Sequence, residues 1–199
     1  MSNMTVQEIG SIVLPAPTWD RASPVLQLLR DRHSSREFSP RSLPLEVLST
    51  LLWAAFGINR PETAGRTAPS AHNWQEIEVF AVLAEAAYRY DPAAHALHLV
   101  KAGDLRALTG VQDFVGGAPL DLVYVADFSK MSDANDEQRT FFASADAAAI
   151  AQNVYLLCAC TELATVVRGL IDRRKLAGAL GLTVDQRIVL AQTVGYPAG

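Results

Sequence analysis

The sequence predicts an α+β protein whose central sheet, antiparallel or mixed, is flanked by helices. Helical patterns come first, short strands joined by short turns follow, and a long alanine-rich helix precedes a last strand. No GxGxxG or P-loop motif follows any of these strands. The order of elements and the short turns therefore favour this class over repeated βαβ units.

Composition narrows the class of protein further. The chain has 199 residues, is 50% hydrophobic, and carries 17 basic against 21 acidic side chains, so one domain over residues 1–199 is expected, with residues 1–20 as an N-terminal extension. The acidic balance disfavours nucleic-acid binding. Apolar stretches are interrupted before the roughly 18 residues that a membrane span needs, and the start lacks a basic signal-peptide region. A cytoplasmic protein without a membrane partner is expected.

Two helices open the predicted fold. Ser23-Pro24 starts the first because proline suits the first helical turn, and its apolar stripe ends near Arg30. The second begins at Pro44 and stops at Gly57. Residues 58–76 form a connection rich in Gly, Pro and Asn, and its length indicates a functional segment.

The rest of the chain alternates strands with helices. Strands are predicted at residues 78–83, 87–90, 96–100, 120–126, 165–168 and 188–194. Helical turns are expected at residues 104–108, 134–163 and 172–180, the last ending at Gly181. The small side chains of the long helix permit close approach of another helix, such as one from a second subunit.

Cysteine and histidine give no sign of a metal site. Cys158 and Cys160 are two apart in a predicted helix, so they point to different faces, and both are expected to be buried thiols. The histidines are scattered.

The first motif with chemical potential is Arg32-His33-Ser34-Ser35-Arg36. In an extended chain Arg32, Ser34 and Arg36 share a face, and paired guanidinium donors match phosphate oxygens. The alternative is a solvated, charged helix exit.

Two further motifs offer polar or backbone groups to a ligand. Residues 69–75 (PSAHNWQ) place amide side chains beside an aromatic ring, where they can match the donor and acceptor edge of a heterocycle. Residues 165–169 (TVVRG) form a strand end at which glycine permits close backbone approach. The alternatives are a capped turn with Trp74 in the core, and a plain strand before a helix cap at Asp172.

Together these motifs give a specific resemblance. From about Arg30 to Pro197 the sequence resembles the nitroreductase family of FMN-dependent oxidoreductases, in particular its short subgroup. The segments that carry the resemblance are RHSSREFSP (32–40), PLEVLSTLLWAAFGINRP (44–61), GRTAPSAHNWQ (65–75), Asp146 with Gln152 and Asn153, ATVVRG (164–169) and VGYP (194–197).

The resemblance implies a three-layer α+β homodimer that holds FMN at the subunit interface. Three groups of cofactor-binding residues follow from the matched motifs. The phosphate and ribityl chain would contact Arg32, Ser34 and Arg36, with His33 alongside through its backbone. The ring and ribityl chain would meet Pro69, Ser70, Ala71 and Asn73 of the partner chain. The ring would be lined by Val166, Val167, Arg168 and Gly169, with a main-chain N–H near Arg168 facing flavin N5.

The implied activity is hydride transfer from NADH or NADPH to the flavin, then reduction of a small flat acceptor by a ping-pong cycle. Nitroaromatics, quinones and enones are the implied acceptors, and His72, Trp74 and Phe114 are expected to shape their pocket. No catalytic side chain is implied because the flavin carries the chemistry. The alternatives are an azoline-oxidising or enone-reducing flavin dehydrogenase, a flavin-binding protein with little turnover, and a structural domain without a ligand.

The chain departs from the family pattern in two places. Glu162 stands where a glycine precedes the Leu-Ala of this motif, and a positive φ there would cost on the order of 1 kcal/mol. A C-terminal basic pair that holds the phosphate in longer members has no counterpart before Gly199, which implies lower FMN affinity.

Overall fold

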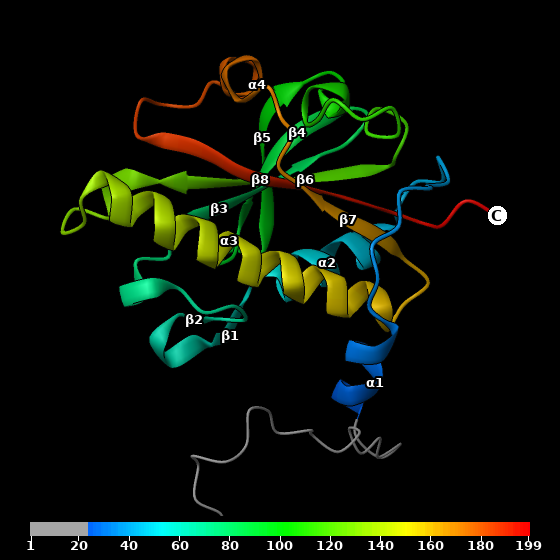
Figure 1. Ribbon diagram of the computed structural model, residues 1–199, viewed down its shortest axis with the longest axis horizontal. Coiled ribbons are helices and arrows are strands. Elements are labelled where there is room, and N and C mark those ends of the chain that lie inside the picture. The colour runs from blue at the N-terminus through cyan, green and yellow to red at the C-terminus, as the bar shows by residue number, and fades with distance from the viewer. Residues whose placement is uncertain (1–23) are drawn as a thin grey trace, which may run out of the picture.

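The computed structural model describes residues 24–199 (Figure 1). The N-terminal extension predicted over residues 1–20 lies outside this range. The helices are α1 (Pro24–Asp31), α2 (Leu45–Phe56), α3 (Asp136–Ala159) and α4 (Arg173–Leu180). The strands are β1 (Ile58–Arg60), β2 (Gly65–Arg66), β3 (Ile77–Val82), β4 (Ala86–Asp91), β5 (Ala96–Ala102), β6 (Leu120–Asp127), β7 (Ala164–Arg168) and β8 (Gln186–Gly195).

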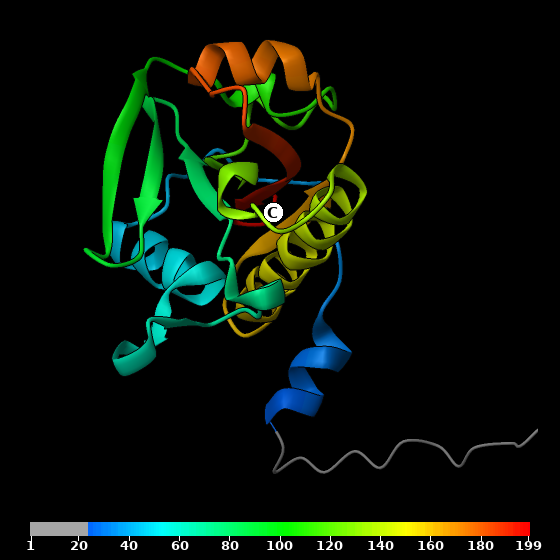
Figure 2. The same cartoon turned by 90° about the vertical axis from the view of Figure 1, so that its left-hand side faces the viewer.

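A six-stranded sheet in the order β5-β4-β3-β6-β8-β7 forms the centre, and every neighbouring pair is antiparallel. Helices α2 and α3 cover one face and α4 covers the other, as Figures 1 and 2 show. The predicted α+β class with a helix-flanked sheet is confirmed. Strand β6 lies inside the sheet and is buried from Leu120 to Ala126, as its continuous apolar run predicts.

Alternation along the central strands builds two cores. Leu122 and Tyr124 of β6 face α2 and α3, while Val123 and Val125 face α4. The first core adds Leu51, Phe56, Val79, Ala81, Ile150 and Val154, and the second adds Phe80, Ile188, Leu176 and Leu180. Both faces of the sheet are therefore fixed by apolar packing.

Helix α3 lies on the sheet through small side chains. Ala143, Ala147 and Ala151 are buried on the face that carries Ile150 and Val154. Alanine at these positions brings the helix axis close to the strands. By length and composition α3 could cross a membrane, but its apolar face packs in the first core.

The ends of α3 differ from the prediction of residues 134–163. Asn135 and Gln138 form a capping box, so the helix begins at Asp136. It ends at Ala159, which leaves Cys160 exposed while Cys158 is buried, so the expectation of two buried thiols is wrong for Cys160.

The connection over residues 58–76 contains more structure than predicted. Strands β1 and β2 form a small hairpin, and a 3-10 turn covers residues 71–73. Gly57 follows the last residue of α2, and a Cβ there would lie 2.5 Å from Trp53 Cδ1. Its φ of −70° shows that close approach, and not a left-handed conformation, requires the glycine.

Candidate functional site

Residues 32–36, called here the arginine segment, run beside the edge strand β7. The Ser35 amide donates to the Thr165 carbonyl at 3.0 Å. The Arg32 guanidinium lies over the ring of Tyr155, with Cζ 5.2 Å from the ring centroid. Within residues 24–199 neither Arg32 nor Arg36 has a carboxylate within ion-pair distance. Within the described residues, the segment therefore presents two guanidinium groups that no carboxylate pairs with.

The His33 side chain contacts the backbone at the end of α1. Its Nδ1 is 2.8 Å from the Asp31 carbonyl oxygen. With Ser35 and Glu162 it lines a cavity of about 250 Å³. Glu162 is not among the residues of the described chain with positive φ, so the strain considered for this glycine position does not arise.

The end of β7 offers backbone groups near the arginine segment. The Val167 amide donates to the Tyr155 hydroxyl at 2.9 Å. Val166 is buried, and Gly169 after the strand is exposed. Tyr155 thus joins β7 to the arginine segment, because its hydroxyl also lies 2.7 Å from Ser34 Oγ.

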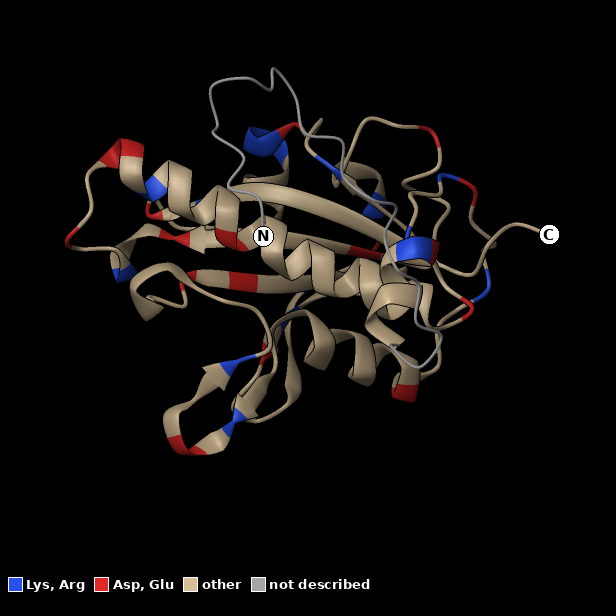
Figure 3. Cartoon of the chain, turned by 60° about the horizontal axis from the view of Figure 1, so that its bottom comes forward, with Lys and Arg blue, Asp and Glu red and all other residues tan. Residues whose placement is uncertain are grey.

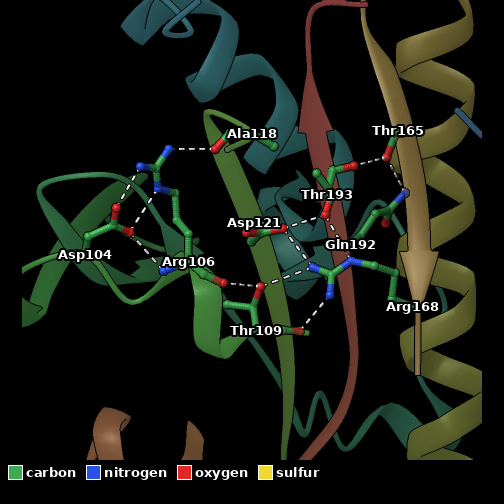
Figure 4. Close-up of polar contacts among 9 residues, drawn as sticks. All are labelled: Asp104, Arg106, Thr109, Ala118, Asp121, Thr165, Arg168, Gln192 and Thr193. Carbon is green, nitrogen blue, oxygen red and sulfur yellow. Dashed lines mark hydrogen bonds and ion pairs between the residues drawn. The ribbon is translucent and has the colours of Figure 1, made fainter. Parts of the chain in front are cut away.

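The Arg168 side chain lies in the protein interior (Figure 4). Its Nη2 is 2.7 Å from Asp121 Oδ1, and the two side chains are 2% and 0% exposed. Further donations go to the Thr109 carbonyl at 2.7 Å and the Thr193 hydroxyl at 2.9 Å. Only the backbone of Arg168 remains for a ligand, and its guanidinium fixes the end of β7.

Burial of the Arg168–Asp121 ion pair shifts the pKa of its carboxyl group. It raises the pKa of Asp121 to about 6, although Arg168 opposes the shift. A Cβ at Gly110 would lie 1.9 Å from Arg168 Nη1, so glycine leaves room for the guanidinium. Arg106 pairs with Asp104 at 2.7 Å and donates to the Ala118 carbonyl (Figure 4), which anchors the connection between β5 and β6 beside this pair.

Two carboxyl groups hold the loop of residues 69–75. Asp146 of α3 accepts from the Ala71 amide at 2.8 Å, and Glu76 accepts from the Ser70 hydroxyl at 3.2 Å. The backbone amide of Gln75 donates to Ser70 Oγ at 2.8 Å. These bonds support an unusual backbone, since φ is positive at three non-glycine residues of this loop: His72, Asn73 and Gln75.

Glu76 is fully buried beside Asp146. Burial, followed by the charge of Asp146 and a hydrogen bond to it, raises the pKa of Glu76 to about 7. Its Oε1 has no hydrogen-bond partner within the described chain. Glu76 therefore keeps its proton to a higher pH than an ordinary glutamate, close to the loop.

The three aromatic residues predicted to shape a pocket fall into two groups. His72 and Trp74 stack with centroids 4.4 Å apart, and Phe142 packs edge-on against both. Phe114 instead packs against Phe38, with centroids 5.6 Å apart. Within one chain the Phe114 ring packs apart from the rings of His72 and Trp74.

The loop of residues 69–75 and the arginine segment are also held at separate points of α3 within one chain. Asp146 holds the loop and Tyr155 contacts the arginine segment, and these residues are nine positions apart on α3. A rise of 1.5 Å per residue separates them by about 13 Å along the helix. Sequence reasoning missed Tyr155 and Glu76. A tyrosine in an apolar helix resembles a core residue. The only sequence signal for Glu76 is its position directly after the loop.

Comparisons with known proteins place this chain in a family. The profile of the Nitroreductase family matches residues 29–196, so the chain belongs to the nitroreductase family. A crystal structure from Ralstonia eutropha JMP134, described as a putative nitroreductase, is 48% identical with a TM-score of 0.85, covering 92% of this chain and 88% of that one. A putative nitroreductase of Methanocaldococcus jannaschii is 28% identical over 71% of this chain and 76% of the relative.

A third relative, from Desulfovibrio desulfuricans, was solved in complex with FMN. It is 24% identical with a TM-score of 0.64, and the match covers 89% of this chain and 88% of that chain. At this identity the likeness establishes the shared fold.

The buried ion pair gives a first prediction. Arg168→Met should lower the free energy of unfolding by about 3–5 kcal/mol, because it leaves Asp121 buried without its cation. Adding Asp121→Leu should recover at least half of the loss. Urea unfolding measures both, with the exposed Arg174→Met as control. A loss below about 1 kcal/mol in the single variant would show that the pair does not hold β7.

The carboxyl pair gives a second prediction, on pH dependence. The folded pKa of Glu76 lies above the ordinary value of 4.5, so the folded chain binds this proton more tightly and loses stability as pH rises from about 4.5 to about 7. Glu76→Gln mimics the protonated form and should remove about 2 kcal/mol of this fall. Urea titrations at pH 5 and pH 8 measure it, with the exposed Glu85→Gln as control. Equal pH dependence in the wild type and Glu76→Gln would contradict the assignment.

Proposed function

We propose that this protein is an FMN-dependent oxidoreductase that takes hydride from NADH or NADPH and reduces a small flat acceptor. Membership of the nitroreductase family supports the oxidoreductase class and the flavin cofactor. The FMN complex of the D. desulfuricans relative, which shares the fold, supports FMN in particular. Nitroaromatics, quinones and enones are the proposed acceptors.

The observation that carries the proposal is the donor set of the arginine segment. Arg32 and Arg36 lack carboxylate partners within residues 24–199, and the exposed Ser34 offers a hydroxyl between them. Guanidinium and hydroxyl groups are typical ligands of a phosphate dianion. The residues present therefore fit the phosphate of FMN.

The remaining groups are assigned by their position relative to this segment. The backbone of Val166, Val167, Arg168 and Gly169 would lie beside the flavin ring, because β7 adjoins the arginine segment. The backbone of His33 would support the phosphate end. A second copy would contribute Pro69, Ser70, Ala71 and Asn73. Within one chain Asp146, which holds this loop, and Tyr155, which contacts the arginine segment, are about 13 Å apart along α3.

Homodimer formation is proposed because α1 and α3 leave apolar groups uncovered. Phe141 of α3 is 66% exposed, and Ala145 and Ala148 on the same helix are exposed as well. Between Asp146 and the end of α3 at Ala159 the helix sequence contains no charged residue, and Figure 3 draws much of this helix in tan. In α1 no residue is buried, and Val25 and Leu29 are exposed. A second copy across this face would cover them and complete the site.

Bound FMN would supply the hydride-accepting N5 atom. The chain's own contribution is positional: the Arg168–Asp121 pair holds the end of β7, and Asp146 with Glu76 holds the loop of residues 69–75. The stacked His72 and Trp74 offer aromatic faces to a flat acceptor, with Phe114 proposed to join them from the other copy. One pocket would serve donor and acceptor in turn. We also propose a cytoplasmic, single-domain protein without nucleic-acid or membrane partners.

Visible spectroscopy and anaerobic titration test the proposed function. Protein incubated with FMN and desalted should keep flavin absorbance, and NADH or NADPH should bleach it. Menadione and nitrofurazone should then accelerate NAD(P)H consumption above the rate with free FMN. Retained flavin without such acceleration would indicate a flavin-binding role, and a colourless product would contradict the proposal.

Arg32→Ala tests the phosphate assignment. FMN should bind about 10- to 100-fold more weakly, because a charge-assisted hydrogen bond is lost. The melting temperature of the apo-protein should stay within about 2 °C, since Arg32 has no ion-pair partner in the described chain. Fluorescence titration measures binding, and Arg174→Ala on α4 is the matched control. Unchanged FMN affinity would refute the assignment.

A further inference from the structure

Tyr155 occupies a polar junction on the buried, largely apolar face of α3. The residue is 6% exposed, and its neighbours on the buried face are Ala151, Val154 and Cys158. Phenylalanine would fill the same space without a polar group. Burying a hydroxyl without a hydrogen-bond partner is unfavourable, so a tyrosine at this position requires polar contacts.

The Tyr155 hydroxyl contacts two segments that are distant in sequence. It accepts a hydrogen bond from the Val167 amide of β7 at 2.9 Å. It also lies 2.7 Å from Ser34 Oγ in the arginine segment. The ring carries the Arg32 guanidinium, with Cζ 5.2 Å from the centroid. One side chain thus touches Arg32 and Ser34 of the arginine segment and the strand beside it.

These contacts are compatible with one direction of proton donation. The amide of Val167 can only donate, so it uses one lone pair of the Tyr155 oxygen. The single Tyr155 proton is then free to point at Ser34 Oγ. In that arrangement Ser34 accepts from Tyr155 and keeps its own proton for an external acceptor. An anion beside Arg32 would supply such an acceptor and favour this arrangement.

We propose that Tyr155 is a positioning residue for the phosphate end of the cofactor. Its hydroxyl orients Ser34 with the serine proton directed outward, and its ring holds Arg32 beside that proton. Tyr155 itself makes no contact with the phosphate. This inference rests on the proposed function, because it takes the anion to be the phosphate of FMN.

Comparison of FMN with riboflavin isolates the phosphate. For Tyr155→Phe, which keeps the ring, FMN should bind about tenfold more weakly, as expected for one lost hydrogen bond to a charged system. Riboflavin, which lacks the phosphate, should bind within about twofold of the wild type. Fluorescence titration of the full-length apo-protein gives both constants.

Tyr124→Phe is the matched control. The Tyr124 hydroxyl is fully buried and donates to Gln192 Oε1 at 2.6 Å, so its removal disturbs the first core, which α3 covers, without touching the arginine segment. This variant should leave the ratio of FMN to riboflavin affinity unchanged. A change in that ratio equal to the change in Tyr155→Phe would assign the effect to general destabilisation and overturn the proposal.

A double-mutant cycle with Ser34→Ala tests the link itself. If Tyr155 acts through Ser34, the double variant should bind FMN no more weakly than Ser34→Ala within about twofold. Additive losses, or an unchanged FMN-to-riboflavin ratio in Tyr155→Phe, would overturn the role of Tyr155 while leaving the proposed function intact. Wild-type protein that binds neither flavin would contradict both.

Discussion

The packing of α3 on the central sheet is the constraint on which the candidate site depends. Alanines at positions 143, 147 and 151 let the helix lie close to the strands. Two polar side chains interrupt the same buried face, Asp146 toward the loop of residues 69–75 and Tyr155 toward the arginine segment. Each side chain holds a segment in place by a hydrogen bond, and neither segment has regular secondary structure over most of its length. The spacing between them along one rigid helix determines that the two segments stay apart within a chain.

Buried polar groups surround the candidate site, and each holds backbone in place. Arg168 and Asp121 secure the end of β7 from the interior, in contact with Thr109 and Thr193. Glu76 supports a loop with positive φ at several non-glycine residues. A flavin enzyme of this kind needs a rigid, correctly shaped pocket more than it needs an acid or base, because the cofactor carries the chemistry. The distribution of buried charge is consistent with that requirement.

Local signals predicted much of the fold but only part of the site. Helix ends marked by proline or glycine, at Pro24, Pro44 and Gly181, were within one residue of the observed bounds. The side-chain direction of Arg168 was not predictable, because it depends on Asp121, which is 47 residues earlier in the chain. The hairpin of β1 and β2 was missed because glycine and proline conceal so short a pairing. Family resemblance named candidate cofactor residues, and the structure adds the groups that hold those residues in place.

Mixed dimers test the central claim, that one flavin site draws on two chains, most directly. One copy would carry Arg32→Ala with Arg36→Ala, and the other Ala71→Trp, which fills the place proposed for the ring. Each variant alone should lose FMN. Co-expression with two affinity tags would isolate the mixed dimer, in which one site has both its parts intact. The account predicts that this dimer regains one FMN per two chains. No regained flavin, with the dimer folded, would show that a single chain supplies both parts.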